Sequence, residues 1–386
     1  MQNERIFADF VARLQEWMCG ELPIQDTPES EAQFNGLAVE LFGLQYEHNP
    51  AYQRICRARN VAPEQVKHWK EVPFVPVVAF KEHEMSSIPP GERTLVFHSS
   101  GTTGQKPSRH FHSAASLQVY EASLLPWFKR WFLPANHTPA GLRFLFLTPE
   151  AASAQHSSLV HMFETIRTQH AQAGFLFAGQ TGADGSWEID NAAAIKFLEQ
   201  AIQEHQPVAV MGTAFNFVHF LDALSNTGKR LRLPAGSRVM ETGGYKGRSR
   251  EMSKLELHAW ICEMLGLTRS DIVCEYGMSE LSSQAYDQVA GQRQLQVSGS
   301  GSQFEETGLF HFPPWTRVQM ISPETGREVG DGEPGIIRVF DLANVFSVAP
   351  LQTEDLAIRH GNGFQLLGRA TEAEPRGCSL MSGGGN

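Results

Sequence analysis

The middle of the chain alternates short apolar runs with longer segments of helical periodicity, and this alternation restricts the fold more than any other feature. Four runs of six to eight residues end in small or turn-forming residues: RFLFLT (143–148), VAVMGT (208–213), SRVMETGG (237–244) and DIVCEYG (271–277). The segments between them repeat apolar residues three and four positions apart. Strands that alternate with helices pair in parallel, and the helices cover the sheet. The predicted fold class is therefore α/β, with ligand-binding groups at the carboxyl ends of the strands.

Different patterns lie on either side of this region. The segment IFADFVARLQEWM (6–18) places apolar residues on one face of a helix, and the following residues continue in that style. Near the other end, shorter strands alternate with Gly and Pro. We therefore expect four parts: a helical segment packed on the core (1–70), an α/β core (71–308), a β-rich subdomain (309–370) and a flexible tail (371–386).

Composition and charge exclude several classes of function. The 386 residues include 32 Lys and Arg against 42 Asp and Glu, and a net charge of −10 argues against non-specific binding to nucleic acid. No uncharged apolar run approaches the roughly 20 residues that cross a bilayer. The N-terminal residues mix charged with apolar side chains, which is not typical of a signal peptide. We therefore expect a cytoplasmic protein that neither binds nucleic acid nor inserts into a membrane.

The cysteine pattern agrees with a reducing compartment, because no C-x-x-C spacing occurs. Four of the five cysteines lie in helix-like or strand-like stretches and are expected to be small core residues: Cys19, Cys56, Cys262 and Cys274. The fifth, Cys378, lies between glycine and serine near the end of the chain. A nearby arginine favours its thiolate form, although a cysteine without a function is the alternative.

The stretch SSGTTGQKPSRH (99–110) is unsuited to a core, because glycine has no side chain to bury and hydroxyl groups need partners. It follows an expected strand (94–99) and precedes an expected helix (113–132). Backbone N–H groups and hydroxyls in such a loop can converge on a phosphate. A polar surface turn is the alternative for this loop taken alone. A Walker-type loop is excluded, since G-x-x-x-x-G-K-[ST] is not present.

Five stretches in order resemble the adenylate-forming enzymes, the superfamily of acyl-CoA synthetases, peptide-synthetase adenylation domains and firefly luciferase. They are HSSGTTGQKPSRH (98–110), ETGGYKG (241–247), CEYGMSE (274–280), GDGEPGIIRV (330–339) and TEDLAIR (353–359) followed by LLGR (366–369). The resemblance implies the large-domain fold of that superfamily, with helix-covered, mostly parallel sheets and a small β-rich subdomain. It also implies that the usual mobile C-terminal subdomain is lacking, because only seventeen residues follow Arg369.

That subdomain carries a lysine that assists adenylation in most of the superfamily. Its absence implies that another cation replaces it here or that it is dispensable. The candidates are Lys246, Arg248 and Arg109.

The resemblance assigns roles to individual residues, with ATP and Mg²⁺ as the implied cofactors. The group expected around the β and γ phosphates comprises Ser99, Ser100, Gly101, Thr102, Thr103, Gly104 and Lys106. The group expected around adenine and the neighbouring acyl group comprises Gly243, Gly244, Tyr245, Tyr276 and Gly277. The remaining group comprises Ser279 for the α-phosphate, Glu280 for magnesium, Asp355 for the ribose hydroxyls, and Arg369. For Glu280 and Asp355 a solvated surface acid is the alternative, which their spacing from the other motifs outweighs.

The end of the chain narrows the resemblance. ATEAEPRGCSLMSGGGN (370–386), together with LFGLQYEHNPAYQRIC (41–56), is similar to the acyl-protein synthetase family, the LuxE-type component of bacterial bioluminescence fatty acid reductase. This implies ATP-dependent activation of a fatty acid, expected to be long-chain, and transfer of the acyl group to Cys378 as a thioester. Lys106, Glu280 and Cys378 are then the catalytic residues, and an acyl reductase or acyltransferase is the implied protein partner.

Two other functions stay open at this point. One is an AMP-forming ligase that passes the acyl group to coenzyme A or a carrier protein and has no use for Cys378. The other is a non-catalytic subunit that binds an acyl nucleotide.

Overall fold

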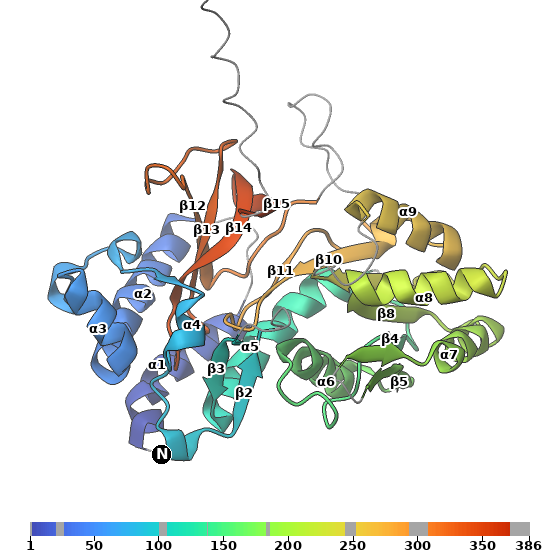
Figure 1. The fold of residues 1–386 in the computed structure, drawn as a ribbon, viewed down its shortest axis with the longest axis horizontal. Helices are drawn as coiled ribbons and strands as arrows, with labels where there is room; N and C mark the ends of the chain where they lie inside the picture. The colour runs from blue at the N-terminus through green and yellow to red at the C-terminus, as the bar shows by residue number, and fades with distance from the viewer. Residues whose placement is uncertain are drawn as a thin grey trace, which may run out of the picture.

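The computed structural model describes residues 2–20, 27–99, 106–136, 138–182, 186–243, 252–292 and 308–370. Figure 1 shows two sheets side by side, one flanked by α6–α9 and the other by α1–α3. No helix within the described ranges is both long and apolar enough to cross a membrane.

The larger sheet has six strands in the order β11-β10-β9-β8-β4-β5. Their bounds are β4 Arg143–Phe146, β5 Phe175–Phe177, β8 Val208–Thr213, β9 Arg238–Thr242, β10 Ile272–Tyr276 and β11 Ala285–Tyr286. All neighbouring pairs are parallel except β10 with β11. The four apolar runs therefore form β4, β8, β9 and β10, and the predicted α/β class is confirmed.

Helices cover both faces of this sheet because successive side chains of a strand point to opposite faces. Leu145, Val210 and Val239 pack against α7 (Asn191–Gln203), α8 (Ala214–Asn226) and α9 (Lys254–Leu265). Phe146, Met211 and Met240 pack on the other face, against α5 (Ala114–Phe132) and α6 (Ser158–His170). The strands are thus buried on both sides, as expected for a parallel sheet.

The second sheet is built mainly from the C-terminal part of the chain. Its strands are β1 Val75–Pro76, β12 Thr316–Ile321, β13 Pro334–Asp341, β14 Pro350–His360 and β15 Gly363–Arg369. The order is β1-β14-β13-β12, with β15 also paired to β14. Only β1 runs parallel to its neighbour.

The N-terminal helices pack on this second sheet. They are α1 (Gln2–Cys19), α2 (Pro28–His48) and α3 (Pro50–Ala58), followed by 3-10 turns at Pro63–Gln65 and Trp69–Glu71. Their apolar faces share one core cluster with β13 and β14. The buried side chain of Gln45 donates to Asn344 O at 2.8 Å and accepts from Ala349 N at 3.0 Å. Helices from the start of the chain are therefore joined to strands from its end.

The glycine and hydroxyl stretch lies in a hairpin, not between a strand and a helix. β2 (Leu95–His98) pairs antiparallel with β3 (Arg109–His112), and only then does α5 begin, with Ser113 as its N-cap. The expectation that the loop leads directly into the helix was wrong. β3 has the sequence RHFH, whose buried positions are histidines, so the apolar alternation that marks a strand is absent.

The remaining elements are short. They are α4 (Ala79–Glu82), a 3-10 turn at Pro90–Glu92, the hairpin of β6 (Gly179–Thr181) with β7 (Trp187–Ile189), and a 3-10 turn at Arg269–Asp271. Cys56 and Cys274 are buried and Cys262 is half-buried, whereas Cys19 is exposed. The expectation of a core position was therefore wrong for Cys19, which is the last residue of its helix.

Candidate active site

Residues from three strands meet where the two sheets adjoin. Tyr276 ends β10, and its hydroxyl donates a hydrogen bond to Asp355 Oδ2 on β14 at 2.9 Å. Arg369 ends β15 opposite Asp355, with its Nε 3.9 Å from Asp355 Oδ1. Burial and the neighbouring Asp355 charge raise the pKa of Tyr276, so its hydroxyl remains a donor. Three of the predicted residues are thus brought together from distant parts of the sequence.

An aromatic wall supports Tyr276. The ring centroid of Tyr276 lies 6.0 Å from that of Phe310, 6.1 Å from Phe312 and 5.6 Å from Phe364. Phe310 and Phe364 are themselves stacked at 5.6 Å. Sequence reasoning did not identify these residues, although the alternation in LFHFPPW (309–315) was a possible signal. The wall therefore fixes the plane of the Tyr276 ring.

The two ends of the hydroxyl-rich loop are held beside Ser279. Ser279 Oγ donates to His98 O at 3.0 Å, and the ring Nδ1 of His110 lies 2.9 Å from Ser279 O. Ser99 and Ser108 exchange two hydrogen bonds, at 3.3 and 3.0 Å, across the base of the loop. The histidines that flank the loop therefore act as structural contacts between it and the segment that carries Ser279 and Glu280.

Glu280 is a buried carboxylate, only 6% exposed. Burial raises its pKa, while the Ser108 hydroxyl and the charges of Lys81 and Arg369 act in the opposite direction. A carboxylate that burial makes harder to ionise is stabilised by a cation beside it. Oxygen is the ligand that Mg²⁺ prefers, so Glu280 fits the expected magnesium-binding role. Lys81, on α4, was not identified from the sequence.

Two predicted glycines occupy positions that other residues fit poorly. Gly243 follows β9 with φ of +69°, in the left-handed region that side chains disfavour. A Cβ at Gly277 would require the carboxylate end of the Glu275 side chain to shift. Both glycines lie directly at the carboxyl ends of neighbouring parallel strands, where open α/β sheets bind ligands.

Several predicted residues lie outside the described residues. They are Ser100, Gly101, Thr102, Thr103, Gly104, Gly244, Tyr245 and Cys378, together with Lys246 and Arg248. Lys106 is described and exposed, at the point where the described chain resumes after the loop. Arg109, the third candidate to replace the missing lysine, has its Nη1 3.6 Å from Glu84 Oε1.

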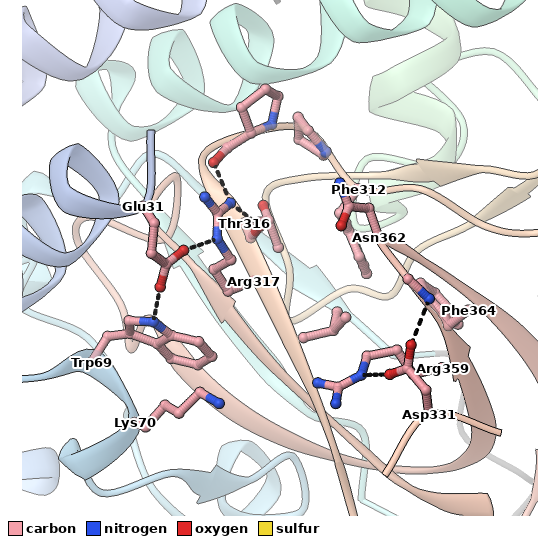
Figure 2. A pocket seen from close by; sticks show the side chains of 14 residues that line it. Glu31, Trp69, Lys70, Phe312, Thr316, Arg317, Asp331, Arg359, Asn362 and Phe364 are labelled. Carbon is pink, nitrogen blue, oxygen red and sulfur yellow. Dashed lines mark hydrogen bonds and ion pairs between the residues drawn. The ribbon is translucent and has the colours of Figure 1, made fainter. Parts of the chain in front are cut away.

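A pocket of about 310 Å³ lies beside the aromatic wall (Figure 2). Phe312 and Phe364 contribute to it, but none of the residues assigned to the nucleotide does. The charged groups around it are paired, as in Arg317 Nε to Glu31 Oε2 at 2.8 Å and Arg359 Nε to Asp331 Oδ1 at 2.6 Å. This pocket therefore does not coincide with the strand ends at which the sequence predicts a nucleotide site.

The sequence profile of the family described as "Acyl-protein synthetase, LuxE" matches residues 23–383. The chain is 20% identical over 360 residues to the "Long-chain-fatty-acid--luciferin-component ligase" of Aliivibrio fischeri, covering 89% of this chain and 86% of that protein. It is 19% identical over 348 residues to the protein of the same name from Vibrio harveyi, covering 87% and 83%.

Among solved structures, the fold is similar to that of 2-hydroxyisobutyryl-CoA ligase. An open conformation of that enzyme, in complex with 2-HIB-AMP and CoA, gives a TM-score of 0.61 at 15% identity, covering 91% of this chain and 75% of that chain. Its postadenylation state gives a TM-score of 0.62, covering 92% and 73%. The likeness at this identity establishes the fold, and the predicted adenylate-forming-enzyme fold is confirmed.

Proposed function

The chain belongs to the LuxE acyl-protein synthetase family, and from this membership we propose that it activates a fatty acid with ATP and carries the acyl group on Cys378 as a thioester. The match to this family confirms the family predicted from the sequence. The relatives from Aliivibrio fischeri and Vibrio harveyi are named as ligases, which confirms the predicted enzyme class.

The observation that best supports adenylation is the hydrogen bond of Tyr276 to Asp355, which joins the two sheets. The buried Glu280 follows Tyr276 by four residues. This arrangement suits a nucleotide whose base lies against Tyr276 and whose ribose hydroxyls donate to Asp355. The fatty acid carboxylate then attacks the α-phosphorus, the new O–P bond forms, and the bond to pyrophosphate breaks. Such a reaction needs positioning and charge neutralisation more than covalent help from the protein.

Magnesium is proposed at Glu280, where it would neutralise phosphate charge when bound. Ser279, whose hydroxyl lies 3.0 Å from His98 O, is proposed to bind the α-phosphate. Ser99 and Lys106 border the loop proposed to hold the β and γ phosphates. Hydroxyl, amide and ammonium groups of this kind are the usual ligands of phosphate oxygens.

The second step is proposed to use Cys378, which lies outside the described residues. Its thiolate attacks the acyl carbonyl carbon of the adenylate, the C–S bond forms, and the carbonyl carbon to phosphate oxygen bond breaks to release AMP. A thioester keeps the acyl group activated for reduction or transfer. The partner is proposed to be an acyl reductase or acyltransferase, in line with the names of the relatives from Aliivibrio fischeri and Vibrio harveyi.

The activity is tested by ATP–pyrophosphate exchange over carboxylic acids of increasing length. We expect exchange that depends on the acid and on Mg²⁺, with long-chain fatty acids preferred over acetate. Reactions without acid serve as the control. A complete lack of exchange with every acid would instead favour a non-catalytic subunit that binds an acyl nucleotide.

Asp355→Asn is expected to raise the KM for ATP by roughly tenfold to a hundredfold, because hydrogen bonds to a charged acceptor contribute about 1.5–3 kcal/mol. The KM for the fatty acid should change little. Glu324→Gln is the matched control, since Glu324 is an exposed acid in the segment that follows β12. An unchanged KM for ATP in Asp355→Asn would contradict the ribose-binding role.

A further inference from the structure

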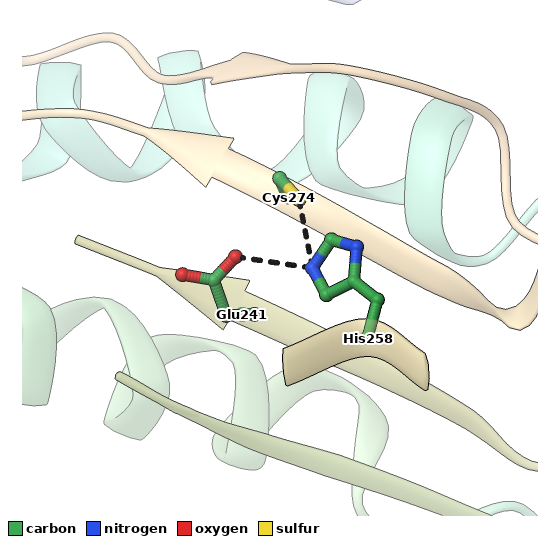
Figure 3. A group of neighbouring side chains, drawn as sticks. All are labelled: Glu241, His258 and Cys274. Carbon is green, nitrogen blue, oxygen red and sulfur yellow. Dashed lines mark hydrogen bonds and ion pairs between the residues drawn. The ribbon is translucent and has the colours of Figure 1, made fainter. Parts of the chain in front are cut away.

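Figure 3 shows a buried group of three side chains that can bind a metal ion: Glu241, His258 and Cys274. Glu241 and Cys274 each lie two residues before a predicted site residue, Gly243 and Tyr276. Glu241 belongs to β9, Cys274 to β10 and His258 to α9. Glu241 and Cys274 are partners in the parallel ladder, so their side chains point to the same face, where α9 packs. Their exposed fractions are 1% for Glu241, 2% for His258 and 0% for Cys274.

The hydrogen bonds within this group are long. His258 Nε2 faces both Glu241 Oε2, at 3.4 Å, and Cys274 Sγ, at 3.6 Å. The His258 ring and the Cys274 thiol both donate toward the Glu241 carboxylate. The N···O separation is also longer than the roughly 2.7–3.2 Å of an ordinary hydrogen bond.

The same separations fit a metal ion. Tetrahedral zinc has bonds of about 2.0–2.2 Å to nitrogen and oxygen and about 2.3 Å to sulfur, which places nitrogen about 3.4 Å from oxygen and about 3.6 Å from sulfur. All three ligand atoms lie within 4.8 Å of one another. Among the described residues, no other group of three or more His, Cys, Asp and Glu side chains has ligand atoms this close together.

We propose that Glu241, His258 and Cys274 bind a borderline-soft divalent cation, with Zn²⁺ as the best match to their oxygen, nitrogen and sulfur atoms. Mg²⁺ is excluded here, because it prefers oxygen ligands. This site is separate from Glu280, and the proposal does not depend on the proposed acyl-ligase activity.

Lys254 already places a positive charge beside Glu241, and a bound metal ion would take over this role. Lys254 Nζ lies 3.6 Å from the same Glu241 Oε2 atom, and its side chain is 33% exposed. Without a metal ion, Lys254 therefore supplies the positive charge beside Glu241.

Metal binding replaces the Cys274 S–H bond with a metal–sulfur bond and releases the proton to solvent, since a coordinated thiol is deprotonated. The 2+ ion then balances the two anionic ligands, Glu241 and Cys274. The ion would connect β9, β10 and α9 two residues before Gly243 and Tyr276, and would thereby stabilise the strand ends of the candidate active site.

The test uses the full-length protein, freed of metal with a chelator and titrated with Co²⁺ as a spectroscopic substitute for Zn²⁺. We expect one Co²⁺ per chain, a thiolate-to-cobalt charge-transfer band, and strong visible bands typical of tetrahedral cobalt. Cys274→Ala should remove the charge-transfer band. Loss of a residue that only contacts a metal ligand weakens metal affinity by roughly 10- to 100-fold. His258→Gln removes a ligand itself and should therefore weaken the affinity for Co²⁺ by more than this.

Matched controls come from cysteines elsewhere in the chain. Cys262→Ser, on the same helix as His258, and Cys378→Ser, in the tail, should both keep the band. No thiolate band in the wild type at saturating Co²⁺ would overturn the proposal, as would a band that persists in Cys274→Ala. X-ray absorption spectroscopy of the zinc-loaded wild-type protein tests the site even if the variants do not fold. It should give one sulfur neighbour at about 2.3 Å, and any other number of sulfur neighbours contradicts the site.

Discussion

Replacing Cys378 with serine is expected to abolish the hydroxylamine-labile acyl label that the protein acquires from ATP, Mg²⁺ and a labelled fatty acid. A serine hydroxyl is scarcely ionised near neutral pH, whereas a thiol in a cationic environment supplies the reactive thiolate. ATP–pyrophosphate exchange should persist in Cys378→Ser, because adenylate formation precedes acyl transfer. The measurement is label per chain, before and after hydroxylamine, beside the exchange rate.

The matched control is Cys19→Ser, because Cys19 is exposed and therefore also accessible to an acyl-adenylate. It should retain full labelling. Undiminished label in Cys378→Ser would contradict the thioester assignment. If that variant instead turns over normally with coenzyme A as acceptor, the chain is an acyl-CoA ligase and Cys378 has no part in the reaction.

Glu280→Gln is expected to lower ATP–pyrophosphate exchange by roughly 100- to 1000-fold, the usual cost of removing one group that stabilises charge in the transition state. An amide lacks the charge that holds magnesium. Burial raises the pKa of Glu280, so burial of the ionised side chain destabilises the folded protein. The melting temperature of Glu280→Gln should therefore be unchanged or higher, which separates lost catalysis from lost folding.

Glu280→Asp provides the matched comparison, since it keeps the charge on a shorter side chain. We expect partial exchange activity that rises with added Mg²⁺, whereas Glu280→Gln should not respond. Exchange at the wild-type rate in Glu280→Gln would remove Glu280 from the magnesium role.

Much of the fold could be predicted because most strands of the larger sheet coincide with apolar runs in the sequence. β8 has the sequence VAVMGT and is buried along nearly its whole length, so the apolar run and the strand coincide. β3 could not be found in this way. Its inward residues are His110 and His112, whose ring nitrogens contact Ser279 O and Ser116 Oγ. Buried histidines carry no apolar signal in the sequence.

The candidate site shows a similar division. Tyr276 and Asp355 were predicted from motifs that lie 79 residues apart, and the structure places them in hydrogen-bond contact. The aromatic wall behind Tyr276 and the presence of Lys81 near Glu280 were not predicted. Neither belongs to a motif, and each depends on how the second sheet packs against the first.

The amino-acid sequence alone predicts the α/β class, the order of the adenylate-forming motifs and the identity of Cys378 as the cysteine outside any helix or strand pattern. These properties depend on local periodicity and on residue types at fixed spacing, which a linear chain displays directly. Only the tertiary structure decided that the hydroxyl-rich loop belongs to a hairpin, that the N-terminal helices pack on C-terminal strands, and that Glu241, His258 and Cys274 meet. Those three residues lie on two strands and a helix, so no spacing in the sequence brings them together. Their contact follows from strand register and from burial of one face of α9.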